Sequence, residues 1–96
     1  MIRVRLPGHL QTLARTGAWV ELPVGLPCSI NEIVDSLECL YPQVGGATRD
    51  RATRRRRPFV RFFCGGEDVS DWDPDQPLPL TDESIPFEIV GAIAGG

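Results

Sequence analysis

One segment of the chain has the pattern of a long helix, and this limits the fold more than any other feature. Ser29 is a favourable N-cap, and Glu32, three residues later, completes a capping box. Pro42 cannot continue the helix and ends it. Between them, apolar residues recur at helical spacing: Ile30, Ile33, Val34, Leu37 and Leu40. A 96-residue chain with one amphipathic helix of about three turns must build the rest of its core from strands.

Strand patterns lie on both sides of this helix. Residues 2–6 alternate strictly between apolar and charged side chains, which is typical of a half-buried strand. A helical turn is predicted over residues 9–16. The expected strands cover residues 2–6, 18–22, 59–64, a short segment around Val69, and 85–90. This order predicts an α+β fold in which a mixed sheet of four to five strands packs on one main helix.

The chain has the length of one domain. We expect residues 1–90 to form it and residues 91–96 to be a flexible tail. Within the domain, residues 43–57 are polar, contain glycine and are strongly basic, so we interpret them as a mobile loop. Residues 71–80, with three Asp and three Pro, are expected to form an irregular connection.

Charge is distributed unevenly along the sequence. The run Arg54–Arg57 lies in the predicted loop, whereas residues 66–90 carry eight acidic groups and no basic ones, and the formal net charge is −3. Nucleic-acid binding would require basic residues joined to stacking aromatic residues or a reading helix. We therefore predict no nucleic-acid partner. The run is expected to contact the acidic segment, to be solvated, or to assist docking of a protein partner.

The sequence has no pattern of a membrane or metal-binding protein. Its apolar runs are far shorter than the roughly 20 residues that cross a bilayer, and residues 1–5 alternate charge and bulk instead of forming a signal segment. We expect a cytoplasmic protein with no membrane partner. The three cysteines form no CxxC pair and His9 is the one histidine, so no disulfide framework, metal site or bound cofactor is predicted.

All ten basic residues are Arg, and the sequence contains no Lys. It therefore offers no side-chain amine for Schiff-base chemistry or for conjugation. No nucleophile–base pair, phosphate-binding loop or metal set is present, so we predict no catalytic residue and no enzyme activity of the chain alone.

The C-terminal segment has the strongest functional signal. It follows a predicted strand directly and contains only apolar residues and glycine: Gly91, Ala92, Ile93, Ala94, Gly95 and Gly96. Such a segment is thin and conformationally free, and could enter a narrow channel that leads to a reactive centre.

The whole chain resembles the β-grasp, ubiquitin-like sulfur carriers of the MoaD/ThiS family. The similarity is most specific in the last twenty or so residues. The matching stretches are Val4–Leu6, residues 30–40, Gly66–Val69, Asp75–Leu78, Asp82–Glu83 and Phe87–Gly96. Two features depart from the family pattern: Asp82–Glu83 stands where Asp-Gly is common, and the basic loop at 43–57 is longer than usual.

The resemblance implies that the chain is a carrier whose chemistry takes place at the α-carboxylate of Gly96. A ubiquitin-activating-like enzyme would use ATP to adenylate this carboxylate. A sulfur source would then convert the acyl adenylate to a thiocarboxylate, which donates its sulfur to an acceptor on a second enzyme, a sulfur-accepting synthase. The acceptor pathway stays open between molybdopterin, cysteine, thiazole and other thio-metabolites. Glycine at 95 and 96 suits this role, since side chains would crowd attack on the acyl carbon.

Partner docking is predicted on the solvent face of the sheet. If Val60, Phe62 and Cys64 point into the core, strand alternation turns their neighbours outward. The candidate docking residues are Phe59, Arg61, Phe63 and Val90. Packing of one of these phenylalanines under the 43–57 loop is an equally acceptable interpretation.

Two other functions remain open from the sequence. The chain could be a ubiquitin-like modifier that is attached to target amines through the same activated Gly96. It could also be a β-grasp interaction module whose surface binds a partner without any chemistry at its C-terminus.

Overall fold

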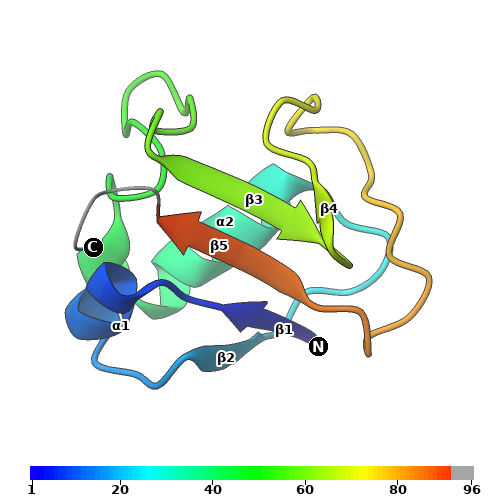
Figure 1. The fold of residues 1–96 in the computed structure, drawn as a ribbon, viewed down its shortest axis with the longest axis horizontal. Helices are drawn as coiled ribbons and strands as arrows, with labels where there is room; N and C mark the ends of the chain where they lie inside the picture. Colours follow the sequence, from blue (N-terminus) through cyan, green and yellow to red (C-terminus); the bar gives the residue numbers. More distant parts are fainter. Residues whose placement is uncertain (92–96) are drawn as a thin grey trace.

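The computed structural model describes residues 1–91, which form a five-stranded mixed sheet with one long helix packed across one face (Figure 1). The strand order is β2-β1-β5-β3-β4, with β1 and β5 parallel and all other neighbours antiparallel. The elements in chain order are β1 (Ile2–Arg5), α1 (Gly8–Ala14), β2 (Trp19–Leu22), α2 (Ile30–Leu40), the 3-10 helix η1 (Pro42–Val44), β3 (Val60–Cys64), β4 (Glu67–Asp68) and β5 (Phe87–Gly91).

The long helix has the predicted bounds. The Ser29 hydroxyl accepts a hydrogen bond from the backbone N–H of Glu32 at 3.2 Å, which caps the first turn of α2. Four of the five predicted apolar positions are buried, and Leu40, the last residue of the helix, is 50% exposed. The core stripe therefore ends at Leu37.

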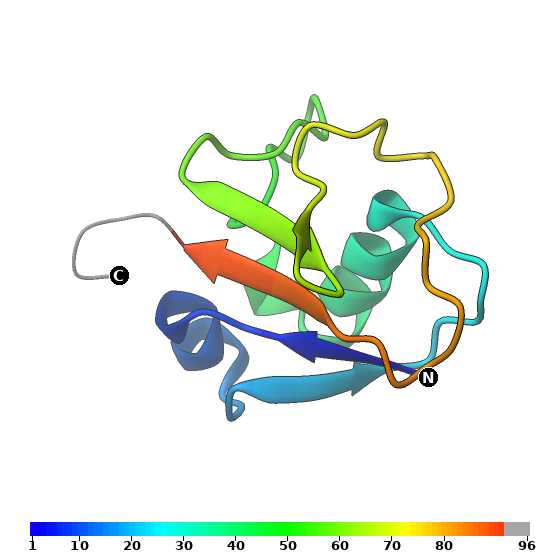
Figure 2. The same ribbon diagram turned by 45° about the vertical axis from the view of Figure 1, so that its right-hand side comes forward.

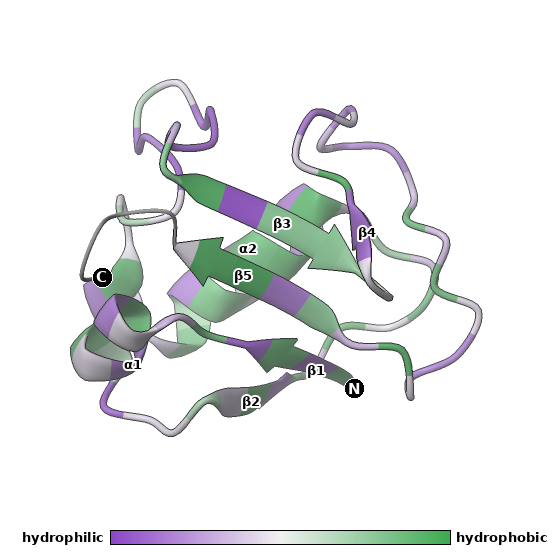
Figure 3. Cartoon of the chain, viewed as in Figure 1, coloured by the Kyte–Doolittle hydropathy of each residue, from purple (hydrophilic) through white to green (hydrophobic). Residues whose placement is uncertain are grey.

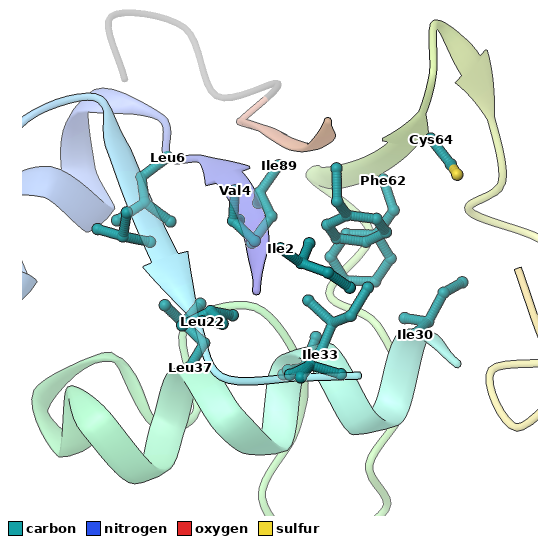
Figure 4. Close-up of a cluster of buried hydrophobic side chains, with 14 of the residues drawn as sticks. Ile2, Val4, Leu6, Leu22, Ile30, Ile33, Leu37, Phe62, Cys64 and Ile89 are labelled. Carbon is teal, nitrogen blue, oxygen red and sulfur yellow. The ribbon is translucent and has the colours of Figure 1, made fainter. Parts of the chain in front are cut away.

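The core lies between α2 and one face of the sheet. Side chains alternate along the strands, so the inward positions are apolar and buried while the outward positions are polar or exposed (Figure 3). Figure 4 shows side chains of β1, β2, β3 and β5 directed toward Ile30, Ile33 and Leu37 of the helix. Phe62 and Phe87 stack in this layer with ring centroids 5.6 Å apart.

A second helix, α1, begins one residue before the predicted helical turn and ends two residues before it. It begins after Pro7, whose carbonyl accepts the N–H groups of Leu10 and Gln11, and it buries Leu10 and Ala14. Arg15 ends it in the left-handed conformation with φ of 59°. In both ribbon views α1 lies beside the C-terminal end of β5 (Figures 1 and 2).

The last strands differ from the prediction at their ends. Ile85 lies in a turn, where the Asp82 carboxylate accepts the backbone N–H of Ser84, so β5 begins only at Phe87. Gly91, predicted as the first tail residue, pairs with Val60 and is the last residue of β5. The short strand predicted around Val69 is β4, which ends at Asp68, and the side chain of Val69 itself is buried in the core.

No helix within residues 1–91 is both long and apolar enough to span a bilayer.

Candidate functional site: the end of strand β5 and the open face of the sheet

Strand β5 carries the chain to the candidate reactive end. It lies in the middle of the sheet, between β1 and β3, and ends at Gly91. The predicted tail residues Ala92, Ile93, Ala94, Gly95 and Gly96 lie outside the described residues. Position 91 is consequently the last point of the candidate site that the structure defines.

Gly91 is packed against the first turn of α1. A methyl group at this position would lie 2.9 Å from His9 Cε1, 3.2 Å from His9 Nδ1 and 3.5 Å from Pro7 Cβ. Both imidazole nitrogens of His9 are buried and have no hydrogen-bond partner in the described part of the chain. Glycine is therefore the residue that lets the imidazole ring lie flush against the end of β5.

A shallow groove adjoins this contact on the outward side. It has a volume of about 360 Å³ and runs between the end of β1, the start of α1 and the last residues of β5. Arg5 and Glu88 lie in its wall, with 3.9 Å between Arg5 Nη1 and Glu88 Oε1. The groove thus leads along the sheet surface to Gly91.

The predicted outward positions of the sheet are outward in the structure. Val60, Phe62 and Cys64 are buried, whereas the alternate residues Arg61 and Phe63 are partly exposed. The strand register places Val90, which is 42% exposed, opposite Arg61. It places Phe63 opposite Glu88, so Phe63 and Val90 are diagonal neighbours on the same face.

Phe59 precedes β3 and is 36% exposed, so part of its side chain is open to solvent. The four predicted docking residues all reach the surface.

Arg61 does not present a free charge. Its Nη2 lies 2.8 Å from the Asp68 carboxylate and 3.7 Å from that of Asp71. Hydrogen bonds from Ser70, together with Arg61, lower the pKa of Asp68 to about 2. The hydrogen bond to Asp68 in turn raises the pKa of Arg61. Both groups stay ionised and paired at neutral pH.

Trp19 also belongs to this face, although it was not among the predicted docking residues. Its side chain is 41% exposed and lies under the Arg3 guanidinium, whose carbon is 4.5 Å from the ring centroid. The alternation in residues 18–22 predicts this orientation, because Val20 and Leu22 point inward and Trp19 must therefore point outward.

The basic segment is largely fixed to the rest of the fold, contrary to the expectation of a mobile loop. Arg49 is buried, and its guanidinium contacts Asp35, Glu38 and Asn31 of α2. Burial opposes ionisation of Asp35, but hydrogen bonds from Arg49 and Arg54 outweigh it and lower the pKa of that carboxyl.

Other arginines of the segment also have structural partners. Arg56 donates to the carbonyls of Ser70 and Val60 and pairs with Asp71 at 3.1 Å. This contact with the acidic segment was predicted, whereas the pairing of Arg49 with α2 was not. A cleft of about 700 Å³ is lined by the basic segment, the start of α2 and residues 70–75.

The cysteines carry no evident chemistry. Cys28 and Cys64 are buried, and desolvation raises the pKa of the Cys28 thiol to about 11. Cys39 is exposed. Within residues 1–91 no group of three or more His, Cys, Asp and Glu side chains is arranged to hold a metal ion.

The element order, the mixed sheet and the single crossing helix define a β-grasp, ubiquitin-like fold. No protein-family model matches the sequence, and no curated protein matches it. Solved structures do match, over nearly the whole chain. One is a chain of the Amycolatopsis orientalis BexX/CysO complex, with a TM-score of 0.79, 20% identity, and coverage of 100% of both chains.

Two further structures show the same arrangement. CysO of Mycobacterium tuberculosis, described as an antigen, matches with a TM-score of 0.78 and 17% identity, over 97% of this chain and 100% of its own. SAMP1 from Haloferax volcanii, a small archaeal modifier protein, matches with a TM-score of 0.76 and 13% identity, over 99% and 98%. At these identities the likeness establishes the fold, and it confirms the β-grasp prediction.

Proposed function

We propose that this chain is a sulfur carrier whose Gly96 carboxylate is adenylated and converted to a thiocarboxylate. The observation that carries the proposal is the position of Gly91. It ends the central strand of a β-grasp sheet, and the five residues that follow it in the sequence finish in Gly95–Gly96. A rigid domain thereby presents a thin, side-chain-poor segment to a partner's reactive centre.

The chemistry requires two partners. In the first step a Gly96 carboxylate oxygen attacks the α-phosphorus of ATP on an adenylating enzyme, and pyrophosphate leaves. A sulfur nucleophile then attacks the acyl carbon, so that a C–S bond forms and AMP departs with the electrons of the C–O bond. If the nucleophile is a persulfide, a thiol must afterwards reduce the resulting S–S bond to release the thiocarboxylate. A synthase finally accepts the sulfur.

The open face of the sheet is the proposed docking surface for these partners. Phe59, Phe63 and Val90 supply its exposed apolar area, and Trp19 extends it toward β2. The groove beside β5 then continues from this surface to Gly91. A partner that covers the face is therefore well placed to take up the C-terminal segment. A reducing compartment such as the cytoplasm suits both the free thiols and the sulfur chemistry.

The test is the intact mass of the protein, purified with an untagged C-terminus. We expect a species heavier by the difference between sulfur and oxygen, with the gain located in the C-terminal peptide, because Met1 or cysteine oxidation adds nearly the same mass. Deletion of Gly96 should abolish it. A protein that stays unmodified with an adenylating partner, ATP and a sulfur source, and that binds partners equally well with a blocked C-terminus, would instead be an interaction module.

A ubiquitin-like modifier is the second candidate, and the similarity to a small archaeal modifier protein supports it. It shares the adenylation step and differs in the nucleophile, which would be an amine of a target protein. Isopeptide-linked conjugates that carry the C-terminal peptide of this chain in cell extracts would favour this function over sulfur transfer.

A further inference from the structure

The ten basic residues are all arginine, although only part of the structure requires the guanidinium group. Arg49 contacts three different side chains of α2, and Arg56 and Arg61 each contact two or more groups. Such multiple contacts use the fork shape of arginine. At these positions the choice of Arg over Lys has a structural reason.

At other positions the contacts give no structural reason for arginine instead of lysine. Arg5 makes one loose ion pair, at 3.9 Å, with Glu88, and its side chain is 58% exposed. The side chains of Arg15 and Arg55 form no hydrogen bond or ion pair with the rest of residues 1–91. Lysine would meet these requirements equally well, since a point charge is all that the sites use.

The two side chains differ in reactivity. A guanidinium stays protonated up to about pH 12 and does not attack acyl groups, whereas a lysine amine attacks them through its deprotonated form. In that attack the Nζ lone pair forms a C–N bond to the acyl carbon, AMP or a thiol leaves with the electrons of the broken bond, and the nitrogen loses a proton to solvent. Thiols and sulfide do not cleave the amide product, so the C-terminus cannot be activated again. Amide formation would therefore remove the carrier permanently.

The α-amino group of Met1 is the remaining amine, and it is out of reach. Because β1 and β5 are parallel with Val4 opposite Phe87, the position of Met1 lies seven residues along the strand direction from Gly91, or about 23 Å. Five residues extend at most ~18 Å. The Met1 amine also pairs with the Glu83 carboxylate. In Figures 1 and 2 the N-terminus lies at the end of the sheet opposite the C-terminal end of β5.

Position 5, in contrast, lies within reach. Arg5 is opposite Glu88, which is three residues from Gly91, or about 10 Å along the strand. The Arg5 side chain also lines the groove that leads to Gly91. An amine at this position would meet an activated C-terminus at a high effective concentration.

We propose that the side chains of this protein form no stable acyl product with its own activated C-terminus, so that no side chain of the protein is a lasting acyl acceptor. The inference rests on the proposed activation of Gly96. It identifies the acceptor as a nucleophile outside the chain. It also means that copies of this chain do not link to one another through side-chain amides.

The exposed Cys39 thiol does not alter this conclusion. Attack by a thiol gives a thioester, which is itself an activated acyl group. Added thiol or sulfide reverses it, so it does not trap the carrier.

The test uses the full-length chain with a C-terminal thioester, prepared by cleaving an intein fusion with a small thiol. This activates Gly96 without an adenylating enzyme, so the outcome does not depend on the proposed function. Wild type, Arg5→Lys and Arg5→Gln are incubated at mildly alkaline pH with excess thiol, and intact masses are followed. The Gln variant removes the charge at position 5 without adding an amine.

Wild type and Arg5→Gln should lose the thioester only by hydrolysis. Arg5→Lys should form a cyclic amide, lighter than the hydrolysed chain by one water, at least ~10-fold faster than any amide forms in wild type. Its rate should be independent of protein concentration. Amide-linked wild-type monomers or dimers at a rate similar to that of Arg5→Lys would overturn the proposal, and so would an Arg5→Lys thioester that only hydrolyses.

Discussion

The contact between Gly91 and His9 can be tested by adding one methyl group. In Gly91→Ala the new Cβ would lie 2.9 Å from His9 Cε1, so the imidazole ring must move by several tenths of an ångström. The ring nitrogens have no hydrogen bonds to lose within the described residues, which keeps the cost toward the lower end of the ~1–3 kcal/mol typical of overpacking. We expect a loss of about 1.5 kcal/mol in the free energy of unfolding. For a domain of this size that lowers Tm by roughly 6–12 °C.

The same substitution in a His9→Ala background should have the opposite sign. The clash is then absent, Pro7 Cβ at 3.5 Å is an ordinary contact, and alanine in a strand is favoured over glycine by ~0.5–1 kcal/mol. A double-mutant cycle measured by urea unfolding should therefore give a coupling free energy of about 2 kcal/mol between positions 9 and 91. Equal effects of Gly91→Ala in both backgrounds would refute the packing argument.

Three further predictions concern the charges and the open face. Arg49→Ala leaves Glu38 without its cation and Asp35 with Arg54 alone, and it should cost about 2–3 kcal/mol in urea unfolding. This is below the 3–5 kcal/mol of a fully buried pair because Asp35 is half exposed and keeps one arginine; an unchanged midpoint would contradict this. The pKa of Asp68 is lowered to about 2, so its contribution to stability is complete above about pH 4 and is lost as the pH falls toward 2; Asp68→Asn should reduce the steepness of acid unfolding in that range. Val90→Ser should change the free energy of unfolding by less than ~0.5 kcal/mol because the side chain is exposed. If the open face docks the adenylating partner, the same substitution should raise the KM for adenylation at least ~5-fold. An unaltered KM would exclude Val90 from docking.

Local patterns were sufficient to predict the helix and the strands. The α2 bounds follow from Ser29, Glu32 and the spacing of apolar residues, all within a dozen positions. The inward and outward faces of β3 likewise follow from alternation alone. These local patterns predict the structure correctly because the core requires apolar residues at these positions, and contacts with distant residues do not change the elements.

The missed features depend on contacts between distant parts of the chain. His9 lies against Gly91, and Arg49 bonds to Asn31, but nothing in either local segment records such a pairing. The sequence around Arg49 is polar and contains glycine, which is typical of a mobile loop, and only the carboxylates of α2 turn it into a fixed one.

The pairing of charges on the open face determines how a partner can recognise it. Arg61 is held by Asp68, Arg5 lies beside Glu88, and Arg3 covers Trp19, so the positive groups of this face are already matched within the chain. A partner that used Arg61 would have to break its pair with Asp68, and the gain from a new ion pair would be offset by the loss of the old one. Val90 has no such competing contact. Recognition of this face therefore depends mainly on apolar area and shape, and salt should affect the affinity of the complex only weakly.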